Sequence, residues 1–492
     1  LANASERVAE FDRQITQTSI DLIGAEERLN RDYPRFMELT NPRPVTVDDL
    51  QKKLLRPGEA LLSYVLLPQE TVIFVVTREE FRMVVSHVRR AEIAERVHGI
   101  RRAIEKVANG ESVLFLRDIE PDTLQSLYRD LVQPVAAQLA GRSKVLVVSD
   151  GPLQTIPFEL FVKSFDAEQR AAFQRTKEAA DGSAARPYLA EYAPLPYLGR
   201  TLRFAYLPSL SSLASQRLYP KRAALSRVEL VAFADPVFTA DAKRKMPEDT
   251  QKALAQLQVP FAKGGGGAAE IPRLAETAEE AKEIARALGG ASRLYVGDQA
   301  QERTVKSAPE LRSARFVLFA THGFLGGEYV GTDLPVEEAE ARRVAAAAKS
   351  GQQAQPSLAL TLVGDLKGED GLLTMKEVIE DLELNADLVA LSACNTAGES
   401  AQANNGEGFA GLTRAFMYAG AKALLVSHWS VDSLSTEKLM TSTFRNIKAG
   451  KPALTAVSDA QRELLAGGYS REQYHFSRAH PFFWAAFVYV GD

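Results

Sequence analysis

Six apolar segments of strand length alternate with helical segments between residues 228 and 491. The strand-like runs are 228–235, 292–297, 314–323, 386–396, 421–429 and 482–491, and helical patterns at 276–290, 301–308, 406–420 and 432–450 lie between most of them. Because these runs are apolar throughout instead of alternating with polar residues, they predict strands that are covered on both faces. The alternation of such strands with helices predicts an α/β fold with a mostly parallel sheet flanked by helices.

A smaller α/β half precedes this region. Strand-like runs at 60–67, 71–77 and 81–88 are followed by helical stretches at 91–107 and about 121–140, and by an apolar strand at 143–162 that ends in a Gly-Pro turn. Residues 163–195 contain few large apolar residues and predict an inserted mobile loop or a solvated helix. A chain of 492 residues exceeds the roughly 250–300 residues at which single cores stop growing. We therefore expect an N-terminal half over 49–225 and a second half over 226–492.

The first 48 residues predict a helical connector. Apolar residues recur at near-helical spacing through 4–39, and Asn-Pro-Arg-Pro at 41–44 ends the pattern because proline fixes φ and removes a hydrogen-bond donor. The chain begins without methionine or a signal-peptide pattern, so we expect a fragment of a longer protein whose upstream part is missing. The glycine run at 263–269 lies outside any strand-to-helix phosphate motif and predicts a linker.

Composition excludes several classes of function. A net charge of −4 gives no basic surface for nucleic acid or an anionic membrane, and no apolar run approaches the roughly 20 residues that span a bilayer. The single cysteine excludes an internal disulfide and fits a reducing compartment, so we expect a cytoplasmic location. The sequence contains no second cysteine and no metal-ligand spacing of His and Asp, and we expect neither a metal nor a cofactor.

Two potentially reactive residues follow consecutive predicted strands. "RFVLFATHGF" delivers His322 and "DLVALSACNTAGE" delivers Cys394, and each run continues into small residues and glycine. Reacting groups in an open α/β sheet collect at the carboxyl ends of its strands, so we expect both residues at the same edge. A cysteine at a strand end is, taken alone, more often inert core than a nucleophile; the pairing with His322 favours catalysis.

A histidine beside a thiol can take its proton or pair with the thiolate, which produces the nucleophile at neutral pH although a free thiol has a pKa of about 8.5. Gly323 has no Cβ, so a substrate carbonyl can approach its backbone. The N–H groups of Gly323 and Cys394 are therefore candidates for an oxyanion hole. The remaining histidines carry no such pattern; for His428, which could line a cleft, we favour packing.

Several blocks of the chain, in order, resemble those of the CHAT domain family. They are "FVLFATHGF", "GLLTMKEVIEDLELNADLVALSACNTAGE", "GEGFAGLTRAFMYAGAKALLVSHWSVD" and "HPFFWAAFVYVGD", preceded by the weaker blocks "VLVVSDGPLQTIPFELF" and "RFAYLPSLSSL". The resemblance covers roughly residues 50–492. It implies the caspase–hemoglobinase fold, which separase shares, and a His–Cys dyad at His322 and Cys394. It also implies a bacterial protein with tetratricopeptide repeats upstream, for which residues 1–48 would be the bridge.

The resemblance further suggests a role for Asp432 in "SHWSVDS". The corresponding segment of caspase-like folds lines the pocket for the residue before the cut, where an acidic group would favour Arg or Lys. Asp432 also precedes a predicted helix, where Asp is a preferred N-cap, and both interpretations stay open. Residues 334–357, between the His and Cys strands, are either an exposed helix and loop or a regulatory loop that orders when an activator binds.

Three functions remain open. The first is a cysteine endopeptidase that cuts a protein substrate in response to a signal sensed by upstream repeats or an activating partner. The second is a non-enzymatic docking or oligomerisation module, which the presence of both dyad residues disfavours. The third is a hydrolase or transferase with a non-peptide acyl substrate, because a thiolate with an oxyanion hole suits any acyl transfer.

Overall fold

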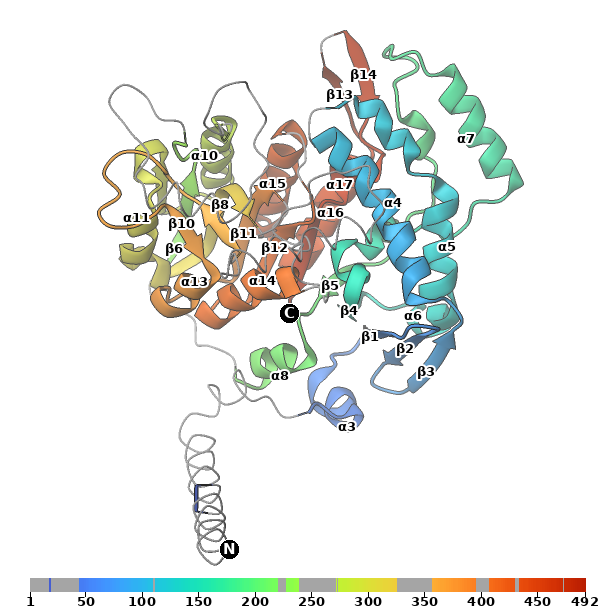
Figure 1. The fold of residues 1–492 in the computed structure, drawn as a ribbon, viewed down its shortest axis with the longest axis horizontal. Coiled ribbons are helices and arrows are strands. Elements are labelled where there is room, and N and C mark those ends of the chain that lie inside the picture. Colours follow the sequence, from blue (N-terminus) through green and yellow to red (C-terminus); the bar gives the residue numbers. More distant parts are fainter. Residues whose placement is uncertain are drawn as a thin grey trace, which may run out of the picture.

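The computed structural model describes residues 17–18, 44–108, 111–219, 227–238, 271, 273–324, 356–394, 407–429, 433–471 and 473–492 (Figure 1). The predicted linker at 263–269, Asp432 and nearly all of the predicted connector and of the 334–357 loop lie outside these residues. Within the described residues, no helix is both long and apolar enough to cross a membrane.

One large sheet contains most of the strands. Its order is β7-β6-β8-β11-β12-β15-β5-β4-β1-β2-β3, with β9 and β10 added beside the end of β8. The strands are β1 (Glu59–Leu66), β2 (Thr71–Val76), β3 (Phe81–Ser86), β4 (Lys144–Val148), β5 (Phe204–Tyr206), β6 (Val228–Ala234), β7 (Ser292–Val296), β8 (Ala314–Phe324), β9 (Ser357–Ala359), β10 (Leu372–Thr374), β11 (Leu388–Cys394), β12 (Ala423–Ser427) and β15 (Phe487–Gly491), and β13 (Gly468–Arg471) pairs separately with β14 (Tyr474–Ser477). The pairings from β7 to β12 are parallel, as are those that join β15, β5, β4 and β1.

Helices cover both faces of this sheet, which confirms the predicted α/β class. They are α3 (Val47–Asp49), α4 (Arg90–Ala108), α5 (Pro121–Leu131), α6 (Ala136–Leu139), α7 (Ala167–Ala179), α8 (Leu210–Leu218), α10 (Glu276–Leu288), α11 (Glu302–Ser307), α13 (Met375–Asp381), α14 (Glu407–Ala419), α15 (Ser433–Lys448), α16 (Ala453–Leu465) and α17 (Pro481–Trp484). Around β8, Phe316 packs on Phe444 of α15 and Phe319 packs on Phe416 of α14, each with ring centroids 5.5 Å apart. Successive side chains of a strand point to opposite faces, so α15 and α14 cover opposite faces of the sheet.

The last strand lies in the middle of the sheet. β15 pairs with β12 on one side and with β5 on the other, so both predicted halves contribute to one sheet and one buried core. The boundary between the halves stays a prediction.

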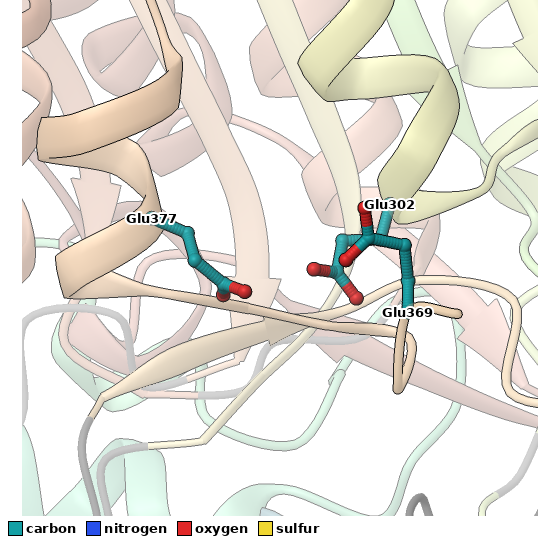
Figure 2. Close-up of side chains that lie close together, drawn as sticks. All are labelled: Glu302, Glu369 and Glu377. Carbon is teal, nitrogen blue, oxygen red and sulfur yellow. The ribbon is translucent and has the colours of Figure 1, made fainter. Parts of the chain in front are cut away.

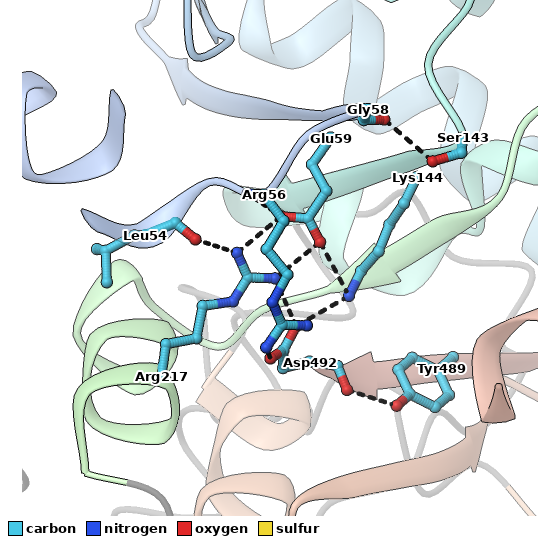
Figure 3. A network of polar contacts seen from close by, with 9 residues as sticks. All are labelled: Leu54, Arg56, Gly58, Glu59, Ser143, Lys144, Arg217, Tyr489 and Asp492. Atoms are coloured by element: carbon cyan, nitrogen blue, oxygen red, sulfur yellow. Dashed lines mark hydrogen bonds and ion pairs between the residues drawn. The ribbon is translucent and has the colours of Figure 1, made fainter. Parts of the chain in front are cut away.

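A cluster of charged side chains surrounds Asp492, the residue after β15 (Figure 3). Arg217 of α8, almost fully buried, donates to Glu59 at 2.7 Å and to Asp492 at 2.5 Å. Lys144 lies 3.0 Å and Arg56 2.6 Å from the Asp492 carboxylate. These contacts connect β1, β4, α8 and the end of β15. We call these five residues the Asp492 cluster.

Two predicted strands are shorter than expected. In 143–162 only β4 is a strand, because the chain leaves the sheet at Asp150 and Gly151-Pro152 begins a tight 3₁₀ turn. In 482–491 the first residues form α17, since His480 accepts a hydrogen bond from the Phe482 N–H as N-cap and Pro481 occupies the first helical position, where its missing N–H costs nothing.

The predicted loop or solvated helix at 163–195 contains α7. Its first turn is closed by a capping box in which Asp166 and Gln169 exchange side-chain and backbone hydrogen bonds. The solvated-helix alternative is therefore the one that describes residues 167–179.

Candidate active site

The strands that carry His322 and Cys394 are direct neighbours. β8 and β11 pair in parallel over seven residues, from Leu388 opposite Phe316 to Cys394 opposite His322. The prediction that both residues leave adjacent strands at one edge of the sheet is thereby confirmed. Parallel register partners are the closest residues on neighbouring strands, which lie about 4.8 Å apart.

The sequence places the pair there because the middle of each strand is apolar. Val317, Leu318, Phe319 and Ala320 of β8 are fully buried, and so are Leu388 to Leu391 of β11. Burial fixes the register, since a shift of one residue would exchange the side chains on the two faces. His322 is half-buried at the end of this block, and its ring packs against Phe238, with centroids 5.2 Å apart.

Gly323 follows His322 and belongs to a short antiparallel pairing of β8 with β9. It lies opposite Leu358 of β9, and the Thr321 hydroxyl donates to the Ala359 carbonyl. The oxyanion hole of Gly323 and Cys394 stays a prediction.

A buried carboxyl group lies beside the Cys394 strand. Glu280 of α10 is 3 % exposed and accepts a hydrogen bond from the Ser392 hydroxyl, two residues before Cys394. Burial, with smaller contributions from the charges of Glu437 and Glu276, raises the pKa of Glu280 to about 8, although the Ser392 hydrogen bond lowers it. Sequence reasoning missed Glu280; its signal was a glutamate on the apolar stripe of α10, four residues before Ile284.

Two further histidines, His428 and His480, are buried. His428 is 1 % exposed, in agreement with the packing interpretation. His480 is fully buried against Tyr192, and desolvation lowers its pKa to about 3. A neutral ring at neutral pH suits its function as a helix cap.

Three glutamates converge at a second location, between α11, the loop before β10 and α13 (Figure 2). The carboxylate oxygens of Glu302, Glu369 and Glu377 lie within 4.8 Å of one another, close enough to hold a cation. The Lys306 ammonium lies 2.5, 2.8 and 2.9 Å from them, so a cation from the chain itself already lies between these carboxylates. Burial raises the pKa of Glu302, a cost that the ion pair with Lys306 offsets only in part. We call these four residues the Lys306 cluster.

Comparison with known proteins agrees with the sequence blocks. The CHAT domain model matches residues 121–492. Tetratricopeptide repeat protein 28 of Homo sapiens is 29 % identical over 121 residues, and its Mus musculus counterpart 28 % identical. The match covers 25 % of this chain and 4 % of each relative, so the chain spans a small part of their length.

Among solved structures, separase in the Saccharomyces cerevisiae separase–securin complex matches with a TM-score of 0.46 and 10 % identity, over 90 % of this chain and 31 % of that one. The Arg-specific cysteine proteinase gingipain R matches with a TM-score of 0.35 and 7 % identity, over 80 % of this chain and 73 % of that one.

Proposed function

The chain belongs to the CHAT domain family, and on this premise we propose that it is a cysteine endopeptidase in which His322 and Cys394 form the catalytic dyad. The observation that supports the proposal most is the register of β8 and β11, in which the two residues are paired. A nucleophile and its base must lie within hydrogen-bond reach, and adjacent register positions at one sheet edge meet the backbone requirement for that.

The reaction would proceed through an acyl-enzyme. The Cys394 thiol loses its proton to His322, and the sulfur attacks the peptide carbonyl carbon. The negative charge on the carbonyl oxygen is stabilised by N–H groups, for which Gly323 and Cys394 are the candidates. His322 returns the proton to the amine that leaves, and a water molecule, deprotonated by His322, then releases the acid and restores the thiol.

The substrate in this proposal is a protein, cut when upstream repeats or an activating partner respond to a signal, in the cytoplasm. Tetratricopeptide repeats occur in the name of the two curated relatives, but this chain covers only 4 % of their length. For Asp432 we keep both roles, as a partner for a basic residue before the cut and as a helix N-cap.

The test is a cleavage assay on a peptide library derived from a whole proteome, with new N-termini identified by mass spectrometry. Wild type and His475→Ala, a matched control at a half-buried histidine of β14, should cut. Cys394→Ala and His322→Ala should not. Equal cutting by all four proteins would overturn the proposal.

Absence of cutting by wild type, together with failure of a thiol-directed peptide probe to label Cys394, would indicate the non-enzymatic module instead. The same library tests Asp432. The basic-pocket role predicts Arg or Lys before the cut, and loss of that preference in Asp432→Ala. An unchanged preference in the variant would leave only the N-cap role.

A further inference from the structure

The segment that follows β6 packs against the proposed catalytic histidine. Phe238 is 2 % exposed, and its ring lies 5.2 Å from that of His322, tilted by 54°. β6 pairs with β8 up to Ala234 opposite Ala320, so the chain leaves β6 two residues short of the level of His322 and Phe238 follows four residues later. Phe238 thus comes from a different element than either residue of the dyad.

The turn that brings Phe238 to this position is strained. Asp235 has a φ of +47°, in the left-handed region that a residue with a Cβ adopts only at an energetic cost of the order of 1 kcal/mol. Pro236 follows and restricts the chain further. Strain of this kind persists only where the surrounding contacts enforce it.

Contacts on two sides enforce this turn. On one side the Asp235 carboxylate binds the Arg273 guanidinium through two hydrogen bonds of 2.8 and 2.7 Å, and the Asp235 N–H donates to the Thr277 hydroxyl of α10 at 2.8 Å. On the other side the Val237 N–H donates to the Thr361 hydroxyl at 3.2 Å, and the Val237 carbonyl accepts from the Leu362 N–H at 2.9 Å. The backbone next to Phe238 is therefore fixed both to α10 and to the irregular segment that follows β9.

We propose that Phe238 is a positioning residue that fixes the orientation of the His322 imidazole toward Cys394. The inference rests on the proposed function, because it assigns a role in the dyad and not a new site. An aromatic ring against an imidazole restricts its rotation and excludes water from that side, and a displacement of about 1 Å in a catalytic group can cost about a hundredfold in rate. Among the described residues on the segments around Phe238, the charged side chains Asp235 and Arg273 are paired with each other, and Glu280 hydrogen bonds with Ser392.

The test uses the single cysteine of the chain, so that iodoacetamide labelling reports on Cys394 alone. At pH 6.5 a thiol with the ordinary pKa of about 8.5 is about 1 % ionised, whereas a thiol paired with His322 is mostly thiolate. After allowance for the lower nucleophilicity of a more acidic thiol, loss of the pairing should slow labelling about fivefold. We expect this slower labelling in Phe238→Ala. In Phe238→Leu the labelling rate should partly recover, because leucine restores the packing volume but not the aromatic ring.

The matched control is Phe233→Leu. Phe233 is fully buried in β6 and stacks on Phe319, on the face opposite to that of His322. We expect Phe233→Leu to lower the melting temperature, as the Phe238 variants do, but to leave the rate of Cys394 labelling unchanged. Wild-type labelling in Phe238→Ala would overturn the inference. If His322→Ala also labels like wild type, the dyad itself is wrong, so the two failures are distinguishable.

Discussion

The Asp492 cluster predicts a stability difference that depends on pH. Burial alone would raise the pKa of Asp492, but Arg217 and Lys144 outweigh it and lower the pKa from 3.8 to about 2. For a carboxyl group with a lowered pKa, the stabilisation is fully present above the pKa of the unfolded chain and is lost as the pH falls through the folded value. The lowered pKa of Asp492 corresponds to a stabilisation of the folded state by about 2 kcal/mol at pH 7 and by about half of that at pH 3.

Asp492→Asn removes this titration and keeps the size of the side chain. The assay is urea unfolding of wild type and variant at pH 7, 5 and 3, followed by tryptophan fluorescence. We expect the variant to be about 2 kcal/mol less stable at pH 7, with a difference that shrinks as the pH falls. Asp365→Asn is the matched control, because Asp365 pairs with Lys367 at an exposed position and should leave the midpoint unchanged. A difference that is absent at pH 7, or equal at all three pH values, would refute the reasoning.

Two further predictions concern the other buried carboxylates. Lys306→Ala leaves the carboxylates of the Lys306 cluster without their cation, so it should destabilise the protein by about 3 kcal/mol. Added Ca²⁺ should then raise the melting temperature of the variant, because it can replace the missing ammonium group. An equally large rise in the melting temperature of wild type would contradict this prediction. Because burial raises the pKa of Glu280 from 4.5 to about 8, its stabilising contribution is present below about pH 4.5 and is lost as the pH rises through 8. Relative to wild type, the free energy of unfolding of Glu280→Gln should therefore rise by more than about 1 kcal/mol between pH 5 and pH 8, as measured by thermal or urea unfolding. A difference in stability between variant and wild type that stays constant over this range would show that Glu280 does not titrate in the folded state.

The sequence sufficed for the fold class and for the pairing of the two dyad strands. Both follow from local signals: continuous apolar runs predict strands buried on both faces, and two reactive residues at the ends of consecutive runs share one edge if the strands are parallel neighbours. The observed register of Cys394 opposite His322 is what this reasoning required.

The environment of the pair could not be predicted in the same way. Phe238 reaches His322 through a left-handed residue and hydrogen bonds to Thr277 and Thr361, which are distant in sequence. Glu280 sits on a helix whose pattern indicates only a buried stripe. Tertiary contacts of this kind leave no periodicity in the sequence. The predicted lengths of two strands were wrong for a local reason. Gly151-Pro152 ends the first strand early, and the helix cap at His480 starts α17 within the second apolar run.

The pH dependence of Cys394 alkylation tests the central claim most directly. Iodoacetamide labelling of the only cysteine is measured from pH 5 to pH 9 in wild type and in His322→Ala. A working dyad predicts that wild-type labelling reaches its plateau with an apparent pKa well below 8.5, and that His322→Ala follows an ordinary thiol with a pKa of about 8.5. Coincident profiles with a pKa of about 8.5 in both proteins would show that His322 does not act on Cys394, and would contradict the account.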